Sequence, residues 1–402
     1  MIVADSRPAA LPPPATLRLF GTGVLIFVLT IIIGILNGTD LVDFDRNTIL
    51  THVHAGTLGW LTTAIVGAAV WLFGRPDDDA TPLSWATIGV VLVYVAAFWT
   101  GHDVFRPMAG TAMFVVVVWV LVWVGARAAG STRSVPHFAM LLSLVTLGVG
   151  AVMGILLGLA VTGRADWVPD GVAESHPPTM VIGYLVLAAL GLAEWRLTGS
   201  QAADAAAAVA DGRSPRLGLA QVILVFLAGV MLILGIMLDS EPLLIANAPL
   251  EIIGIGIFLK RLWGPLREID WMGGTSDRLL GAATFFLVAN TVLLVYLVGS
   301  SGGDVDKINM SHILALDHMM FVGVLTNTLF ALIRGATGGD HEVGDDIGFF
   351  GINVGLAVFV VGLLAEATIL KRIGTPILGL ALLHAIATVT MRLRAMQSAP
   401  VG

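Results

Sequence analysis

Long apolar runs recur along the whole chain, and they constrain its fold more than any other feature. Of the 402 residues, 57% are hydrophobic and 12% are charged, which is about half the charged share of an ordinary soluble domain. A helix needs about 20 mostly apolar residues to cross the hydrocarbon core of a bilayer. In hydrocarbon all backbone N–H and C=O groups must be bonded within the chain, so each run predicts a membrane-spanning helix.

Polar residues, proline and glycine divide these runs into twelve predicted spans. The spans cover about 17–37, 49–74, 83–102, 109–129, 136–163, 175–197, 217–239, 242–263, 277–299, 308–334, 347–369 and 374–395. We therefore predict an all-α polytopic membrane protein with one transmembrane domain over 17–397. Residues 1–16 are expected to form a flexible N-terminal tail, and 398–402 a short C-terminal one.

The lysines and arginines predict an orientation, because cytoplasmic connections are enriched in them. If the N-terminus is inside, 15 of the 21 basic residues fall on the inner side and 6 on the outer side. Both termini are therefore predicted to be cytoplasmic, in a multi-pass protein of the cell membrane. The longest polar connections, around 201–216 and 335–346, are also predicted to lie inside, and 201–216 reads as a flexible linker.

Composition also excludes several functions. The chain has no cysteine, so disulfides, cysteine-ligated zinc, iron–sulfur clusters and covalently attached c-type haem are excluded. The net charge is −7, and no basic run is longer than two residues. A nucleic-acid partner therefore has no electrostatic basis, and the bilayer is the expected partner.

The histidines are the most informative residues once they are placed on the predicted spans. Six of the nine fall at one depth, near the outer face, on the second, third, sixth and tenth spans: His52, His54, His102, His176, His312 and His318. Ionisable side chains in membrane helices are costly and usually face a cavity, a pathway or a partner. Neutral imidazole is also the commonest protein ligand for haem and transition metals. These histidines predict a cofactor site.

The local sequence around the histidines repeats. His54 and His318 each stand five residues before a glycine, and His52 and His176 each stand seven residues before one. Each such histidine segment lies four predicted spans after the previous one. This spacing predicts three pseudo-symmetric arcs of four helices, over about 17–129, 136–263 and 277–395.

Helical geometry separates the histidines that are close in sequence. His52 and His54 point about 200° apart on a helix, so they cannot face the same ligand plane. His312 and His318 differ by about 240° and about 9 Å of rise. We expect each of these pairs to serve different centres or depths.

Taken together, these residues make the chain resemble subunit I of the haem–copper oxidases and nitric oxide reductases, and equally the NnrS family of membrane haem and copper proteins. The His52-Val-His54 segment with Gly59-Trp60, the His176-Pro177 pair and the His318 segment with Val322-Gly323 carry this resemblance. The architecture covers most of the chain, whereas the motifs cover three short stretches.

The resemblance implies a low-spin haem b held by His54 or His52 together with His318. It implies a role for His312 as the other tenth-span ligand and for His176 as a metal ligand, and His102 is a further candidate metal ligand. Copper or a second haem would occupy this second site. A quinol, a cytochrome or an accessory subunit would donate electrons.

The chain also departs from the oxidase pattern. The seventh span has no histidine, so the histidine pair that binds copper in the oxidases is missing. Met180 stands four residues after His176, where oxidases with a cross-linked tyrosine carry that tyrosine, and Tyr184 lies one turn further on. The glutamate that usually follows the second-span histidines in NnrS proteins is absent. These departures argue against complete oxygen reduction with proton pumping.

Five further residues are candidates for proton transfer or for orienting a ligand: Glu251, Asn247, Asp317, Tyr184 and His384. Glu251 lies near the middle of the eighth span, where it is either a proton carrier or a protonated acid bonded to Asn247. Asp317 either orients a neighbouring imidazole or is only interfacial. For His384, packing is favoured over ligation.

The leading interpretation is a b-type membrane haem protein that transfers electrons, or that binds or reduces nitric oxide or oxygen; any enzyme activity would be that of a haem-dependent oxidoreductase. A non-catalytic haem or metal protein in nitric oxide tolerance or cofactor delivery is one alternative. A proton-coupled carrier is the other, and it predicts no bound chromophore.

Overall fold

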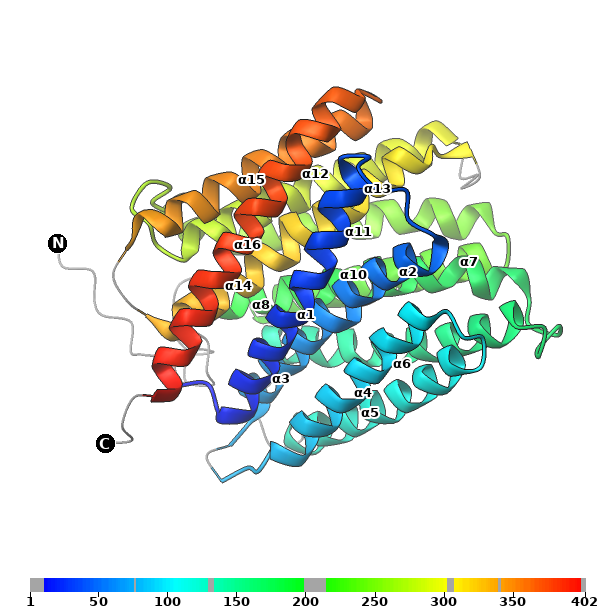
Figure 1. Ribbon diagram of the computed structural model, residues 1–402, viewed down its shortest axis with the longest axis horizontal. Coiled ribbons are helices and arrows are strands. Elements are labelled where there is room, and N and C mark those ends of the chain that lie inside the picture. The colour runs from blue at the N-terminus through cyan, green and yellow to red at the C-terminus, as the bar shows by residue number, and fades with distance from the viewer. Residues whose placement is uncertain are drawn as a thin grey trace.

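The computed structural model of the protein describes residues 11–75, 77–128, 134–198, 215–301, 307–338 and 341–398. Within these ranges all regular elements are helices (Figure 1), and twelve continuous helical segments are long and apolar enough to cross a membrane. The prediction of an all-α chain with twelve membrane-spanning helices is confirmed. Most of the predicted 201–216 linker and of both tails lies outside the described residues, although the first helix already begins at Pro14, within the predicted N-terminal tail.

Nine spans are single helices, and three are composed of an α-helix, a π-helix and a second α-helix. The single helices are α1 (Pro14–Gly38), α4 (Thr81–Thr100), α5 (Phe105–Ala128), α6 (Val135–Val161), α10 (Pro215–Met237), α11 (Glu241–Arg267), α12 (Asp277–Ser301), α15 (Val343–Leu364) and α16 (Thr368–Ser398). The composite spans are α2 (Arg46–His54), η1 (Ala55–Thr62) and α3 (Thr63–Phe73); α7 (Asp170–Pro178), η2 (Thr179–Leu185) and α8 (Val186–Thr198); and α13 (Met310–His318), η4 (Met319–Thr326) and α14 (Asn327–Thr337).

The bundle has two ends, which we name by what lies there. The termini end is where α1 begins and α16 finishes, and the histidine end is where α2, α7 and α13 begin. Both ends can be followed in Figure 1, in which α1 and α16 run side by side.

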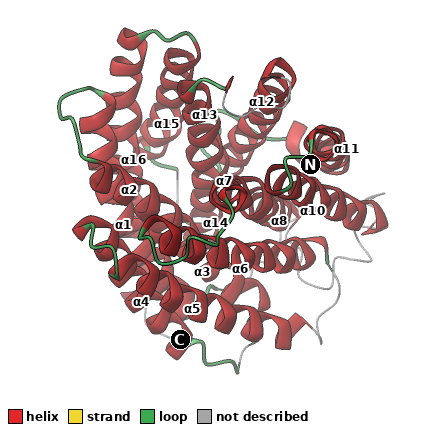
Figure 2. Cartoon of the chain, turned by 90° about the vertical axis from the view of Figure 1, so that its right-hand side faces the viewer, coloured by secondary structure: helices red, strands yellow, loops and turns green. Residues whose placement is uncertain are grey.

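The three composite spans form the interior of the bundle. Their most apolar windows are 83%, 72% and 67% buried, whereas those of the other nine spans are at most 50% buried. Figure 2 shows α3, α8 and α14 in the middle of the bundle, with α4, α5, α11, α12, α15 and α16 around them. The spans that carry polar residues are thus shielded from lipid by the more apolar ones, as the cost of polar groups in hydrocarbon requires.

A π-helix begins at the same point in each composite span, directly after His54, Pro178 and His318. Hydrogen bonds in a π-helix join residues five apart, and such segments occur frequently at functional sites. The sequence analysis did not predict them, because apolar periodicity does not distinguish a π-turn from an α-turn over one or two turns.

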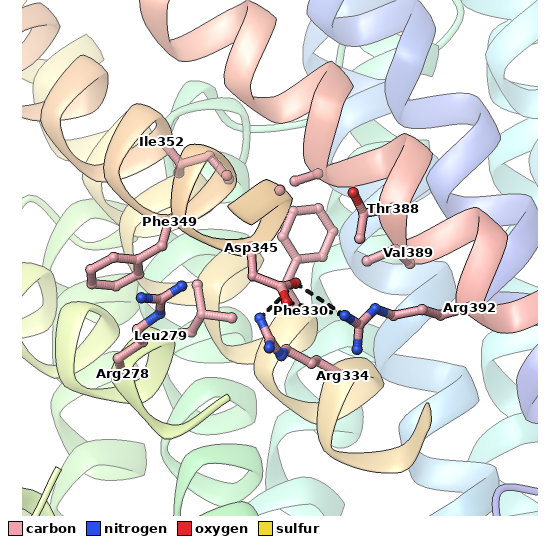
Figure 3. Close-up of a pocket in the computed structure, with 13 residues that line it drawn as sticks. Arg278, Leu279, Phe330, Arg334, Asp345, Phe349, Ile352, Thr388, Val389 and Arg392 are labelled. Carbon is pink, nitrogen blue, oxygen red and sulfur yellow. Dashed lines mark hydrogen bonds and ion pairs between the residues drawn. The ribbon is translucent and has the colours of Figure 1, made fainter. Parts of the chain in front are cut away.

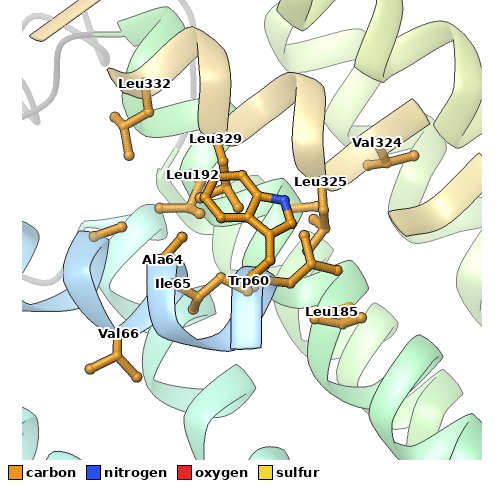
Figure 4. Packing of buried hydrophobic residues seen from close by; sticks show 14 of the residues in the cluster. Trp60, Ala64, Ile65, Val66, Leu185, Leu192, Val324, Leu325, Leu329 and Leu332 are labelled. Atoms are coloured by element: carbon orange, nitrogen blue, oxygen red, sulfur yellow. The ribbon is translucent and has the colours of Figure 1, made fainter. Parts of the chain in front are cut away.

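Trp60 joins the three composite spans at the centre of the bundle. Its side chain is 1% exposed, and its indole N–H donates a 3.0 Å hydrogen bond to the Thr326 hydroxyl on η4. The ring stacks on Phe27 with centroids 5.3 Å apart. Figure 4 shows Trp60 among leucines of the sixth and tenth spans, including Leu185 and Leu325. This aromatic residue therefore fixes the register between η1 and η4.

The boundary between the last two spans differs from the prediction, which put the break near 369–374. The chain turns earlier, at Glu366, which has a left-handed φ of 51°. Lys371 and Arg372 therefore lie on α16, and both bind the Asp40 carboxylate, at 2.8 and 2.9 Å. Their hydrogen bonds hold the pKa of Asp40 below its usual range. The charged pair that looked like a loop ties α16 to the turn after α1.

Helices α15 and α16 pack backbone against backbone through glycine. A Cβ atom placed on Gly374 would lie 2.5 Å from the backbone nitrogen of Phe359, and one on Gly355 would lie 2.5 Å from that of Leu378. Small residues allow this approach in membrane helices, where packing rather than water drives association.

We predict that Gly374→Ala destabilises the protein by about 1–3 kcal/mol, because the added methyl group overlaps backbone atoms that cannot move independently. The measurement is the apparent Tm of the purified protein in detergent. Gly256→Ala is the matched control, since no atom lies within 4 Å of its added Cβ. Equal Tm values for the two variants would contradict this account of the α15–α16 contact.

Candidate functional site

Four histidines at the histidine end share one hydrogen-bonding pattern, in which the Nδ1 atom bonds a backbone carbonyl. The pairs are His52 with Thr30 at 2.9 Å, His54 with Leu50 at 2.7 Å, His176 with Gly150 at 3.0 Å and His318 with Leu314 at 2.7 Å. A carbonyl oxygen only accepts, so Nδ1 carries the proton in each neutral ring. Nε2 keeps its lone pair, and no hydrogen bond reaches it within the described ranges.

Two of these histidines reach across to the preceding span. His52 bonds α1, and His176 bonds α6. In both cases a glycine one turn further along that helix makes room for the ring, because a Cβ on Gly34 would lie 3.0 Å from Cε1 of His52 and one on Gly154 would lie 2.9 Å from Cε1 of His176. The same local arrangement therefore occurs twice.

The other two, His54 and His318, bond the carbonyl four residues earlier in their own helix. Each is the last residue before a π-helix. These two histidines therefore form a second matching pair, at equivalent positions of the second and tenth spans.

The structure pairs the histidines across the second span. His52 lies within electrostatic range of His318, and His54 lies within electrostatic range of His176. This agrees with the angle of about 200° between residues two apart on a helix. The sequence left open whether His52 or His54 is the partner of His318, and the geometry favours His52.

Aromatic and basic side chains surround His54. Its ring stacks on Phe98 of α4, with centroids 3.8 Å apart and planes at 24°. The Arg106 guanidinium also lies over the Phe98 ring, 5.0 Å from its centroid. It donates a 2.6 Å hydrogen bond to the side-chain oxygen of Asn47. The Nε atom of Arg106 is buried and lacks a partner among the described residues. A cation with a spare donor therefore lies beside this histidine.

The other two histidines of the predicted site are not joined to these four. His102 is exposed beyond the end of α4 and stacks on Phe105 at 4.6 Å. His312 is half-buried in the first turn of α13. Across the described part of the chain, no group of three or more His, Asp or Glu side chains is placed to hold a metal ion. The arrangement consists of histidine pairs.

His137 and His384 have the opposite pattern. The Nε2 atom of His384 bonds the carbonyl of Gly344 at 3.0 Å, and that of His137 bonds the carbonyl of Leu72 at 3.1 Å. The Nε2 lone pair is not available in this tautomer. These two histidines join neighbouring helices, which agrees with the packing role favoured for His384.

Glu251 and Asn247 do not bond each other, contrary to one of the two alternatives. Asn247 donates to the Ala228 carbonyl at 2.9 Å. Glu251 accepts from Thr291 at 3.5 Å through Oε1, while its Oε2 is buried and lacks a partner among the described residues. An acid with a free oxygen inside a span remains a candidate proton carrier.

The remaining two predicted residues, Asp317 and Tyr184, do not bond the paired histidines. Asp317 is half-buried beside His318. Tyr184 is fully buried on η2, next to Thr62. Its hydroxyl has no hydrogen-bond partner within the described ranges.

The sequence analysis missed a buried ion pair between the sixth and eighth spans. Arg261 donates to both oxygens of Glu194, at 2.5 and 2.8 Å, and also to Gln221 at 2.8 Å. The arginine and glutamate side chains are 5% and 4% exposed. Arg261 entered only the count of basic residues on the inner side. An acid at position 194, inside a predicted span, was a signal that could have revealed the pair.

No model of a known protein family matches this chain, and no curated protein sequence matches it.

We predict that the haem-free protein contains two classes of histidine tautomer. Because carbonyls fix their Nδ1–H groups, His52, His54, His176 and His318 should be protonated at Nδ1, and the control residues His137 and His384 at Nε2. Nitrogen-15 NMR of histidine-labelled protein, assigned with single His→Gln variants, measures this. Nε2 protonation of His52 or His318 would contradict the geometry described here.

Proposed function

We propose that this chain is an integral membrane protein that holds a b-type haem between its second and tenth spans, with His52 and His318 as the axial ligands. One observation carries the proposal. Two imidazoles from distant parts of the chain lie within electrostatic range of each other, and each presents Nε2 while a carbonyl holds Nδ1–H. A hydrogen bond from the second nitrogen orients a metal-ligating histidine and raises its basicity.

The donor set fits haem. With two neutral imidazole ligands, a b-type haem passes single electrons between its ferric and ferrous states. The residues around the haem would orient its ligands and exclude water. The carbonyls of Thr30 and Leu314 hold the two rings in their tautomers, and the Phe359 ring, 4.8 Å from His318, keeps water from one side of that ligand.

His54 and His176 form the second site in this proposal, for a second haem or a copper ion. Support comes from their proximity, their open Nε2 atoms and the neighbouring arginine. Arg106 is suited to pair with an acidic group of a ligand, because its Nε–H is buried and unpartnered within the described ranges.

We further propose that the twelve spans form three arcs of four helices with both termini in the cytoplasm. The recurrence of a π-helix in every fourth span, starting from the second, supports the arcs. The matching contacts of His52 on α1 and His176 on α6 support them too. The distribution of basic residues, 15 against 6, supports the orientation. The histidine sites would then lie in the outer leaflet.

The proposed activity is electron transfer, or binding or reduction of nitric oxide or oxygen, in a divergent relative of the haem–copper oxidases or NnrS proteins. The absence of histidine from α10 favours a simpler role than complete oxygen reduction. The same fact favours the second candidate, a non-catalytic haem protein in nitric oxide tolerance or cofactor delivery. The free oxygen of Glu251 favours the third, a proton-coupled carrier.

An absorption spectrum tests the proposal. We expect the purified protein to show a Soret band and, after dithionite reduction, an α band typical of b-type haem. His52→Ala and His318→Ala should each abolish the low-spin signal, because each removes an axial ligand.

His384→Ala is the matched control and should leave the spectrum unchanged, since its Nε2 bonds a backbone carbonyl. Haem added during expression should restore colour to the wild type but not to the axial variants. A protein that stays colourless after haem supplementation would overturn the proposal and favour the carrier.

A further inference from the structure

A second polar site lies at the termini end, at the opposite end of the bundle from the paired histidines. It is a cavity of about 50 Å³ between α12, α14, α15 and α16. Three arginines from three different helices line it: Arg278, Arg334 and Arg392. Figure 3 shows Arg334 and Arg392 bound to Asp345, and Arg278 beside Phe349. The sequence analysis used these arginines only as indicators of orientation.

The three arginines form ion pairs with two neighbouring carboxylates. Arg334 and Arg392 both bind the Asp345 carboxylate, at 2.6 and 3.1 Å. Arg278 binds Asp346 through Nη1 at 2.5 Å. Asp345 is thus shared by two arginines, while Arg278 pairs with Asp346.

Arg278 has an unused donor. Its side chain is 1% exposed, and its guanidinium lies over the Phe349 ring, 4.6 Å from the centroid. The Nη2 group is buried and has no partner among the described residues. Leaving a charged donor buried and unbonded is unfavourable, and the apolar wall at Leu279 and Phe330 strengthens the attraction of any anion that enters.

We propose that this arginine pocket, lined by Arg278, Arg334 and Arg392, binds a phosphate group. Guanidinium forks match the oxygen geometry of phosphate. The oxygens of a tetrahedral oxyanion also lie in three dimensions, so they suit donors that approach from different helices better than the planar oxygens of a carboxylate do. The cavity volume is several times what one water needs, which suits a single phosphate group. Its source is either the headgroup of an anionic phospholipid or free phosphate.

Phosphate binding can be measured on the full-length protein in a phosphate-free detergent, by the shift in apparent Tm during titration. One arm uses inorganic phosphate against chloride at equal ionic strength. The other uses short-chain phosphatidic acid against short-chain phosphatidylcholine. Neither arm depends on haem, so the result stands apart from the proposed function.

Arg392→Gln should weaken binding by about tenfold or more, because it removes one charge-assisted contact. Arg278→Lys keeps the charge but loses the fork, and it should weaken binding severalfold even if the glutamine variant does not fold. Arg394→Gln is the matched control, because Arg394 is exposed on the same helix and does not line the cavity.

Stabilisation by inorganic phosphate, with or without phosphatidic acid, identifies a phosphate site open to solvent, and stabilisation by phosphatidic acid alone identifies a lipid headgroup. Either result supports the proposal when it is weakened in Arg278→Lys and kept in Arg394→Gln. Stabilisation by neither probe overturns it. A response that Arg278→Lys retains in full, or that Arg394→Gln loses equally, also overturns it.

Discussion

The cost of placing polar groups in hydrocarbon is the constraint on which the rest of this structure depends. Nine spans are apolar enough to face lipid, whereas the second, sixth and tenth carry histidines and threonines and are the most buried. A helix that bears imidazoles is stable in a bilayer when other helices cover it. The central position of the three composite spans and the location of the paired histidines therefore have the same cause.

Backbone carbonyls orient the paired histidines, and this has a physical advantage in a membrane. A carbonyl oxygen has two lone pairs, so Thr30 and Gly150 can accept from an imidazole while still belonging to a helix. No second ionisable group has to be buried to hold the ring. Gly34 and Gly154 leave the necessary space, so the ring orientation is set before any ligand binds.

The sequence predicted what depends on composition and missed what depends on contact geometry. The twelve spans followed from apolar runs, and the histidine-bearing second, sixth and tenth spans followed from counting helices. Whether His52 or His54 faces His318 depends on how the second span is rotated, which spacing alone does not determine. Lys371 and Arg372 suggested a loop, but both lie on α16 and bind Asp40, far away in the chain. The arginine pocket likewise assembles from four helices.

The π-helices allow the two halves of one span to face different neighbouring helices. Each wide turn accommodates an additional residue, which advances the following helix by about 100° relative to an uninterrupted α-helix. The histidine-bearing half of the second span and its α3 half are thus out of phase. One half can direct His52 and His54 sideways toward different helices, while the other keeps an unbroken apolar contact with α1. Removing one residue from η1 would bring the two halves back into phase and turn both imidazoles away from their partners.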